Sequence, residues 1–86
     1  MKVKVYSTPT CPYCHMAKKY LSQKGVEYED VDVSRDREAA MYMIMKTGQM
    51  GVPVIEICDK FIVGYDPQAI DEALEECASQ SEGEAS

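Results

Sequence analysis

The sequence predicts an α/β fold in which a four-stranded mixed sheet is flanked by three helices. Short β-branched runs alternate with segments whose apolar residues recur at helical spacing, in the order βαβαββα. The first β–α–β stretch predicts a parallel strand pair with a right-handed crossover. The last two β runs are so close together that they predict an antiparallel hairpin.

The first half of the chain supplies two strands and a helix. We expect a buried strand over Val3–Tyr6, and then a helix with Pro12 in its first turn, where the missing N–H costs nothing. Gly25 is typical of the position just after a helix. The following run, Val26–Val33, predicts a strand, and its broken alternation predicts a bulge or register change. The apolar residues at helical spacing are Tyr13, Met16, Ala17, Tyr20 and Leu21.

A second helix is expected to begin at Ser34, a favourable N-cap, and to end at Gly48. The hairpin then comprises residues 52–57 and 61–63 around a turn at residues 58–60. The inward stripe expected for the second helix is Ala40, Met41, Ile44 and Met45.

The last helix is expected to begin after Asp66, a second N-cap, with Pro67 at its first position. Its expected inward residues are Ile70, Ala73, Leu74 and Cys77. If the hairpin joins the parallel pair in one sheet, the result is the thioredoxin fold.

At 86 residues the chain is expected to form one domain, over residues 1–78. Residues 79–86 lack an apolar anchor, so we expect a disordered acidic tail there. No apolar run approaches the roughly 18 residues needed to span a bilayer. The N-terminus leads straight into a strand pattern and not into a signal peptide, which predicts a cytoplasmic protein without membrane attachment.

Cys11 and Cys14 form a Cys-x-x-Cys pair where the first strand gives way to the first helix. Unpaired N–H groups and the positive end of the helix dipole favour a thiolate at Cys11. Cys14 lies about one turn further on, within reach of a disulfide. We expect Cys11 to attack a substrate disulfide and Cys14 to resolve the mixed disulfide, as in a thiol–disulfide oxidoreductase. Pro12 would stiffen the loop, and Tyr13 would be an exposed ring beside it.

The net charge of −6 argues against a nucleic-acid partner, because phosphate binding needs a basic face. The charge is unevenly distributed: residues 1–25 contain five lysines and no acid, whereas acidic residues gather from Asp59 onward. The lysines either favour the thiolate and attract anionic substrates, or simply solvate a strand and a helix face.

Other uses of these cysteines are weaker alternatives. Cys11–His15 matches the C-x-x-C-H signature of c-type haem attachment, but this normally accompanies export. A structural zinc ion would need a second ligand pair, and Cys58, Cys77 and His15 lie at unrelated spacings. A cluster shared by two subunits is compatible with the motif, but nothing requires it. We expect no bound metal, and a surface His15 that modestly tunes Cys14.

Three motifs resemble those of the glutaredoxins, in the same order, over residues 1–78. Cys11-Pro12-Tyr13-Cys14 is similar to the family's dithiol motif, where thioredoxins usually carry Gly-Pro between the cysteines. Residues 47–53 resemble its Thr-Gly-x-x-Thr-Val-Pro loop, and residues 63–66 resemble its Gly-Gly-x-Asp segment. The resemblance implies the thioredoxin fold and a redox role in the cell, with disulfide-containing proteins as partners.

The resemblance also implies a cis peptide bond before Pro53, although base rates alone favour trans by about nineteen to one. A cis bond would turn the backbone of Val52 outward, where its N–H and C=O can pair with an extended peptide. The substrate-binding residues implied by the resemblance are Pro12, Tyr13, Gln49, Gly51, Val52, Pro53, Gly64, Tyr65 and Asp66.

The resemblance to glutathione-binding members is incomplete. Where the family carries a lysine, a threonine, a glycine and a second aspartate, this chain has Thr8, Gly51, Val63 and Pro67. Two electron sources are therefore compatible with the sequence. Glutathione is the first, as a cosubstrate; the alternative is a flavoprotein such as thioredoxin reductase, in a redoxin that serves, for example, ribonucleotide reductase. A protein that holds haem or a metal cluster is a more distant third class.

Cys58 lies in the predicted hairpin turn and Cys77 late in the last helix. Such isolated positions make a poor disulfide framework, so we expect both residues to be structural or incidental and not redox partners. A monomer is the default expectation.

Overall fold

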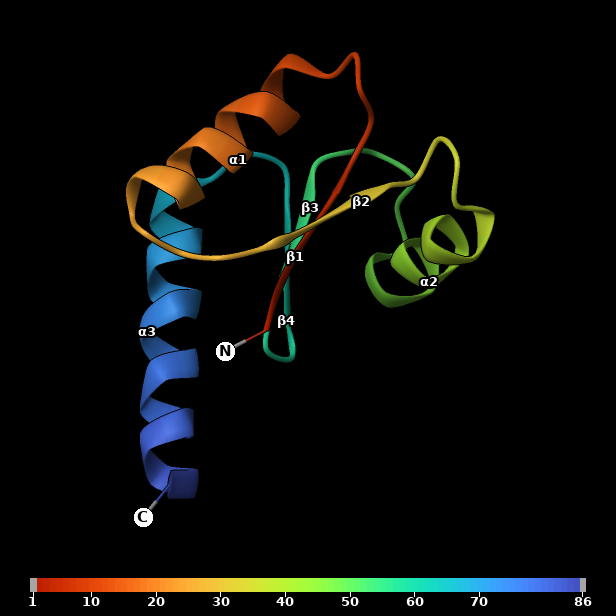
Figure 1. Cartoon of the computed structure of the whole chain (residues 1–86). Helices are drawn as coiled ribbons and strands as arrows, with labels where there is room; N and C mark the ends of the chain where they lie inside the picture. The colour runs from red at the N-terminus through yellow and green to blue at the C-terminus, as the bar shows by residue number, and fades with distance from the viewer. Residues whose placement is uncertain (1, 86) are drawn as a thin grey trace.

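The structure is a computed structural model that describes residues 2–85. It has the predicted architecture, a four-stranded mixed sheet with helices on both faces (Figure 1). The predicted thioredoxin fold is confirmed. In chain order the elements are β1 (Val3–Ser7), α1 (Pro12–Gln23), β2 (Glu29–Asp32), α2 (Arg37–Thr47), β3 (Val54–Ile57), β4 (Lys60–Val63) and α3 (Pro67–Ala85).

β1 lies inside the sheet, whose strand order is β2-β1-β3-β4. It runs parallel to β2, with Ser7 opposite Asp32, and antiparallel to β3, with Val3 opposite Ile57. β3 and β4 form the predicted antiparallel hairpin. The carboxyl end of β1, which leads into the dithiol, therefore lies at the opposite end of the sheet from the β3–β4 turn.

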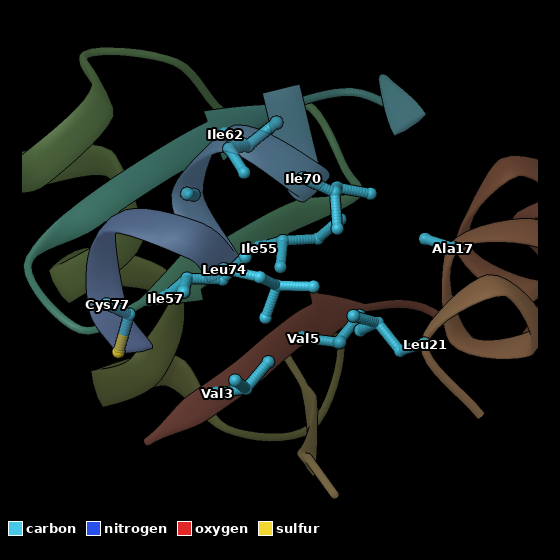
Figure 2. Packing of buried hydrophobic residues seen from close by; sticks show 11 residues of the cluster. Val3, Val5, Ala17, Leu21, Ile55, Ile57, Ile62, Ile70, Leu74 and Cys77 are labelled. Carbon is cyan, nitrogen blue, oxygen red and sulfur yellow. The ribbon is translucent and has the colours of Figure 1, made fainter. Parts of the chain in front are cut away.

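The larger core lies between the sheet and the pair α1 and α3. Alternate residues of β1 and β3, such as Val5 and Ile55, point to this face and are fully buried. Figure 2 shows them with Ala17 and Leu21 from α1 and with residues of α3. The four residues of α3 that the sequence predicted to face inward are Ile70, Ala73, Leu74 and Cys77, and all are buried.

The smaller core lies on the other face, where α2 packs through Met43 against Tyr6 and Val54. The expected inward stripe of α2 is wrong in two places, because Met41 is 60% exposed and Met45 is 78% exposed. Residues 39–45 form an unbroken apolar run, which contains no helical period from which the buried face could be identified.

Two predicted boundaries also differ from the structure. The N-cap of α2 is Asp36, whose side chain accepts from Ala39 N at 3.1 Å, while the predicted cap Ser34 instead donates to Asp32. Capping strength does not distinguish Ser from Asp, so the sequence could not decide between them. The predicted glycines do follow α1 and α2: Gly25 and Gly48 both have φ of +73°.

β2 is shorter than the predicted strand over Val26–Val33, and no bulge is needed. Only residues 29–32 pair with β1. Val26 and Tyr28 pack against the larger core from outside the ladder, and Val26 N donates to Leu21 O at 3.0 Å. The predicted strand is too long because its first apolar residues pack over the end of α1 and do not pair with β1.

α3 is longer than predicted and continues to Ala85, through residues that we expected to form a disordered tail. Adding residues to an existing helix costs much less than starting one, and this segment contains no proline. The expected domain boundary at residue 78 stays a prediction.

Candidate dithiol active site

Cys11 is the N-cap of α1. Its backbone is extended, with φ of −92° and ψ of 113°, and its Sγ accepts a hydrogen bond from Cys14 N at 3.3 Å. Pro12 follows at the first helical position. The Cys11 sulfur therefore occupies the place that a capping oxygen takes in most helices, where free N–H groups and the helix dipole stabilise negative charge.

Cys14 is fully buried, at 0% exposure. The pKa of its thiol is raised to about 11, first by burial and then by a hydrogen bond with Cys11, while the backbone of Thr8 and the charge of Lys18 act in the opposite direction. Both cysteines are free thiols in this structure. Cys14 therefore keeps its proton at neutral pH as long as Cys11 is reduced.

Forming a mixed disulfide would change this balance. Once the Cys11 sulfur is bonded to a substrate, it no longer carries negative charge and no longer holds the Cys14 proton as an acceptor. Two causes that raise the pKa of Cys14 are then removed, and burial remains. Cys14 thus becomes easier to ionise at the stage when its thiolate has to attack.

The loop before β3 lies against the dithiol. The Val52–Pro53 peptide bond is cis, which confirms the expectation from the motif. Cys11 Sγ lies 3.9 Å from Val52 O, although 41 residues separate them in the sequence. Gly64 N donates to Pro53 O at 2.8 Å, so the end of β4 is held beside the same loop. Three separate motifs of the sequence therefore meet at this end of the sheet.

The remaining predicted binding residues have other contacts. Tyr13 is 61% exposed, as expected, and Gly51 is exposed with open space around its Cα. Gln49 N donates to Thr47 Oγ1. The two residues after Gly64 support α3: the Tyr65 ring packs edge-on against Tyr20, and Asp66 caps the helix by accepting from Ala69 N.

A polar network behind Cys14 was not identified from the sequence. Lys18 Nζ donates to Asp30 at 3.0 Å, and the buried Ser7 donates to the other oxygen of Asp30 at 2.8 Å. Burial raises the pKa of Asp30, but the bonds from Lys18 and Ser7 outweigh it, so the pKa lies below its ordinary value. The available signal was the position of Lys18, four residues after Cys14 and therefore on the same helix face.

Two of the five N-terminal lysines are thus paired with acids, Lys18 with Asp30 and Lys24 with Asp71. His15 is exposed, as predicted, and its Nε2 lies 3.0 Å from Pro9 O. Near the dithiol, the charge of Lys18 is therefore partly offset by Asp30.

The side chains that the structure describes include no group of three His, Cys, Asp or Glu that could hold a metal ion. None of the described helices is both long and apolar enough to cross a bilayer.

Comparison with known proteins identifies the family. Residues 3–62 match the glutaredoxin family. The chain is 42% identical to a glutaredoxin-like 8.6 kDa protein in the rubredoxin operon of Clostridium pasteurianum, over 85% of this chain and 97% of that protein. It is 39% identical to glutaredoxin 3 of Escherichia coli, over 74% of this chain and 77% of that one.

Among solved structures, the NrdH-redoxin from Escherichia coli, described as a glutaredoxin-like protein with a thioredoxin-like activity profile, superposes with a TM-score of 0.76. It is 28% identical to this chain, and the match covers 84% of this chain and 93% of that one. The dithiol at the start of α1, the adjoining cis-proline loop and these similarities agree: the chain belongs to the glutaredoxin family, whose members are thiol–disulfide oxidoreductases.

Proposed function

We propose that this protein reduces disulfides in other proteins, and mixed disulfides with glutathione, through Cys11 and Cys14. The observation that supports this most directly is the position of the Cys11 sulfur. It caps α1, it faces the carbonyl of Val52, and it has a second, buried thiol one turn behind it. Such an arrangement suits an attacking thiol with a resolving partner.

The reaction proceeds by two exchanges. The Cys11 thiolate attacks one sulfur of the substrate disulfide, and the other substrate sulfur leaves and takes up a proton. Cys14 then loses its proton and attacks Cys11, which releases the second substrate thiol and leaves a Cys11–Cys14 disulfide. An external reductant supplies two electrons and two protons to regenerate the dithiol.

The substrate chain is bound along the loop that contains Val52. Its extended backbone pairs with the N–H and C=O of Val52 by strand addition, which positions the scissile disulfide over Cys11. Around this contact, Pro12 and Tyr13 border the dithiol on one side. The other proposed binding residues are Gln49, Gly51, Pro53, Gly64, Tyr65 and Asp66.

Glutathione is the proposed electron source and cosubstrate. A flavoprotein reductase is the second candidate, and one observation favours it. Thr8 stands where the resembled motif has a lysine, so this position supplies no cation for a glutathione carboxylate, and Val63, where the motif has a glycine, is an exposed apolar side chain. In that case the protein is a redoxin, and ribonucleotide reductase is an example of the enzyme that it would supply with electrons.

One assay separates the two sources. NADPH consumption is measured with glutathione plus glutathione reductase, and separately with thioredoxin reductase alone, using the same protein disulfide as substrate. Activity with the glutathione system supports the first proposal, and activity only with thioredoxin reductase supports the second. If neither system gives turnover above the level of a Cys11→Ser control, the redox proposal is wrong.

We further propose that the protein works in the cytoplasm as a monomer, where it contributes to redox homeostasis. Cytoplasmic thiols are kept mostly reduced, which matches a dithiol that begins its cycle in the reduced state.

A further inference from the structure

Cys58 and Cys77 form a disulfide that the sequence did not predict. Cys58 lies in the β3–β4 turn with φ of +54°, and Cys77 lies on α3 at 2% exposure. Their Cα atoms are 5.9 Å apart, within the usual span of about 4.4–6.8 Å for a disulfide. The two cysteines that appeared unrelated along the chain are therefore one pair, and the bond links the hairpin to the last helix.

This pair lies far from the dithiol. Cys58 N donates to Lys2 O at 3.0 Å, so the turn is beside the start of β1. Cys11 follows the other end of β1, and five strand residues at about 3.3 Å each lie between the two ends. Because of that distance, Cys11 cannot exchange directly with Cys58 in the same molecule.

The Cys58 side of the bond is open to an attacking thiol. A cavity of about 240 Å³ is lined by both cysteines together with Lys60 and Glu76, which form an ion pair across the same junction. Cys58 is partly exposed, whereas Cys77 belongs to the larger core, at whose edge it is seen in Figure 2. An incoming thiolate therefore reaches the sulfur of Cys58, and Cys77 is the leaving group.

We propose that Cys58 and Cys77 are a second redox centre, which dithiols reduce and which fastens α3 to the hairpin only when oxidised. A thiolate of the external dithiol attacks Cys58, a mixed disulfide forms, and Cys77 leaves and is protonated. The second thiol of the reductant then displaces Cys58. Two electrons pass to the protein, which ends with two thiols, while the reductant ends as a cyclic disulfide.

The consequence of reduction is structural. Ile70, Ala73 and Leu74 hold α3 on the sheet in either state. The oxidised pair in addition closes a loop over a sequence separation of 19 residues, which restricts the unfolded chain. The reduced protein should keep its fold but unfold at a lower temperature.

The test uses the full chain with Cys11→Ser and Cys14→Ser, which leaves only this pair. The protein is equilibrated with oxidised glutathione and then with dithiothreitol. Alkylation counts the free thiols by mass, and melting is followed by circular dichroism. We expect two free thiols in the reduced protein and none in the oxidised one, with a melting temperature about 10 °C or more lower after reduction.

A chain in which Cys58 and Cys77 are also serine is the matched control, and its melting temperature should not respond to dithiothreitol. Peptide mapping of the wild-type chain after alkylation gives a second readout with all four cysteines present. The proposal is overturned if the pair stays reduced in oxidised glutathione, if the bond resists dithiothreitol in the folded protein, or if both states melt together. None of these outcomes depends on activity at Cys11.

Discussion

At the residue scale, the sulfur of reduced Cys11 has two backbone contacts, one with the N–H of Cys14 and one with the carbonyl of Val52. Neither contact depends on a particular side chain, so the position of the sulfur is fixed by the helix start and by the neighbouring loop. Side-chain changes around the dithiol should therefore alter substrate preference more than they alter the nucleophile.

Removing each sulfur in turn should separate the two exchanges. Cys14→Ser should still reduce glutathione mixed disulfides, since a second glutathione can replace the resolving thiol, but should lose reduction of protein disulfides. Cys11→Ser should lose both activities because the first attack is gone. Assays of both variants with a glutathionylated peptide and with a protein disulfide check this. Residual activity of Cys11→Ser would contradict the assigned roles.

The second exchange should depend on pH through Cys14. Burial holds the pKa of its thiol above the ordinary value, so the protonated form dominates at neutral pH and the reactive thiolate increases as pH rises. The rate of release from the Cys11 mixed disulfide should therefore increase about tenfold per unit between about pH 6 and pH 8. Stopped-flow release of a fluorescent substrate thiol measures it. A flat profile would mean that another step limits release.

The residues of this site differ in how far the sequence predicts them. Spacing and chain order suffice for Cys11 and Cys14, because both belong to one helix start. The approach of Val52 depends on a cis bond that base rates disfavour, so only the family resemblance indicated it. Ser7 and Asp30 come from neighbouring strands, and their contact depends on a strand register that no local pattern specifies.

At the element scale, the buried face was predicted correctly for α3 but not for α2. The apolar residues of α3 are spaced by three and four, and all four inward positions are confirmed. α2 has apolar residues on every side, and only the sheet that it covers decides which of them is buried. Apolar periodicity identifies the buried face of a helix only when the opposite face is polar. α2 has no such contrast between its faces.

A pair of methionine substitutions tests the orientation of α2. Met43→Ala removes a side chain at 1% exposure and should lower the free energy of unfolding by about 2–4 kcal/mol. Met45→Ala, on the exposed face of the same helix, should change it by less than about 0.5 kcal/mol. Urea unfolding of both variants measures the difference. Equal losses would mean that α2 packs through a different face.

At the scale of the whole molecule, the acidic net charge of −6 disfavours close approach of two copies. Sedimentation should give a mass near 9.6 kDa for the reduced chain, and the purified protein should be colourless. A coloured dimer that depends on Cys11 would instead indicate a shared cluster. The matched control is the Cys11→Ser variant, which should sediment at the same mass as the wild type.

The position of β1 within the sheet has a consequence for biosynthesis. Tyr6 on β1 and its hydrogen-bond partner Glu56 on β3 are 50 residues apart in the sequence, although α1 and β2 follow β1 closely. As the nascent chain leaves the ribosome, β1 can pair with β2 early. It can pair with β3 on its other edge only after most of the protein has been made. Folding of the sheet should therefore be completed only after β3 has left the ribosome, and fragments that end before β3 would leave that edge open to aggregation.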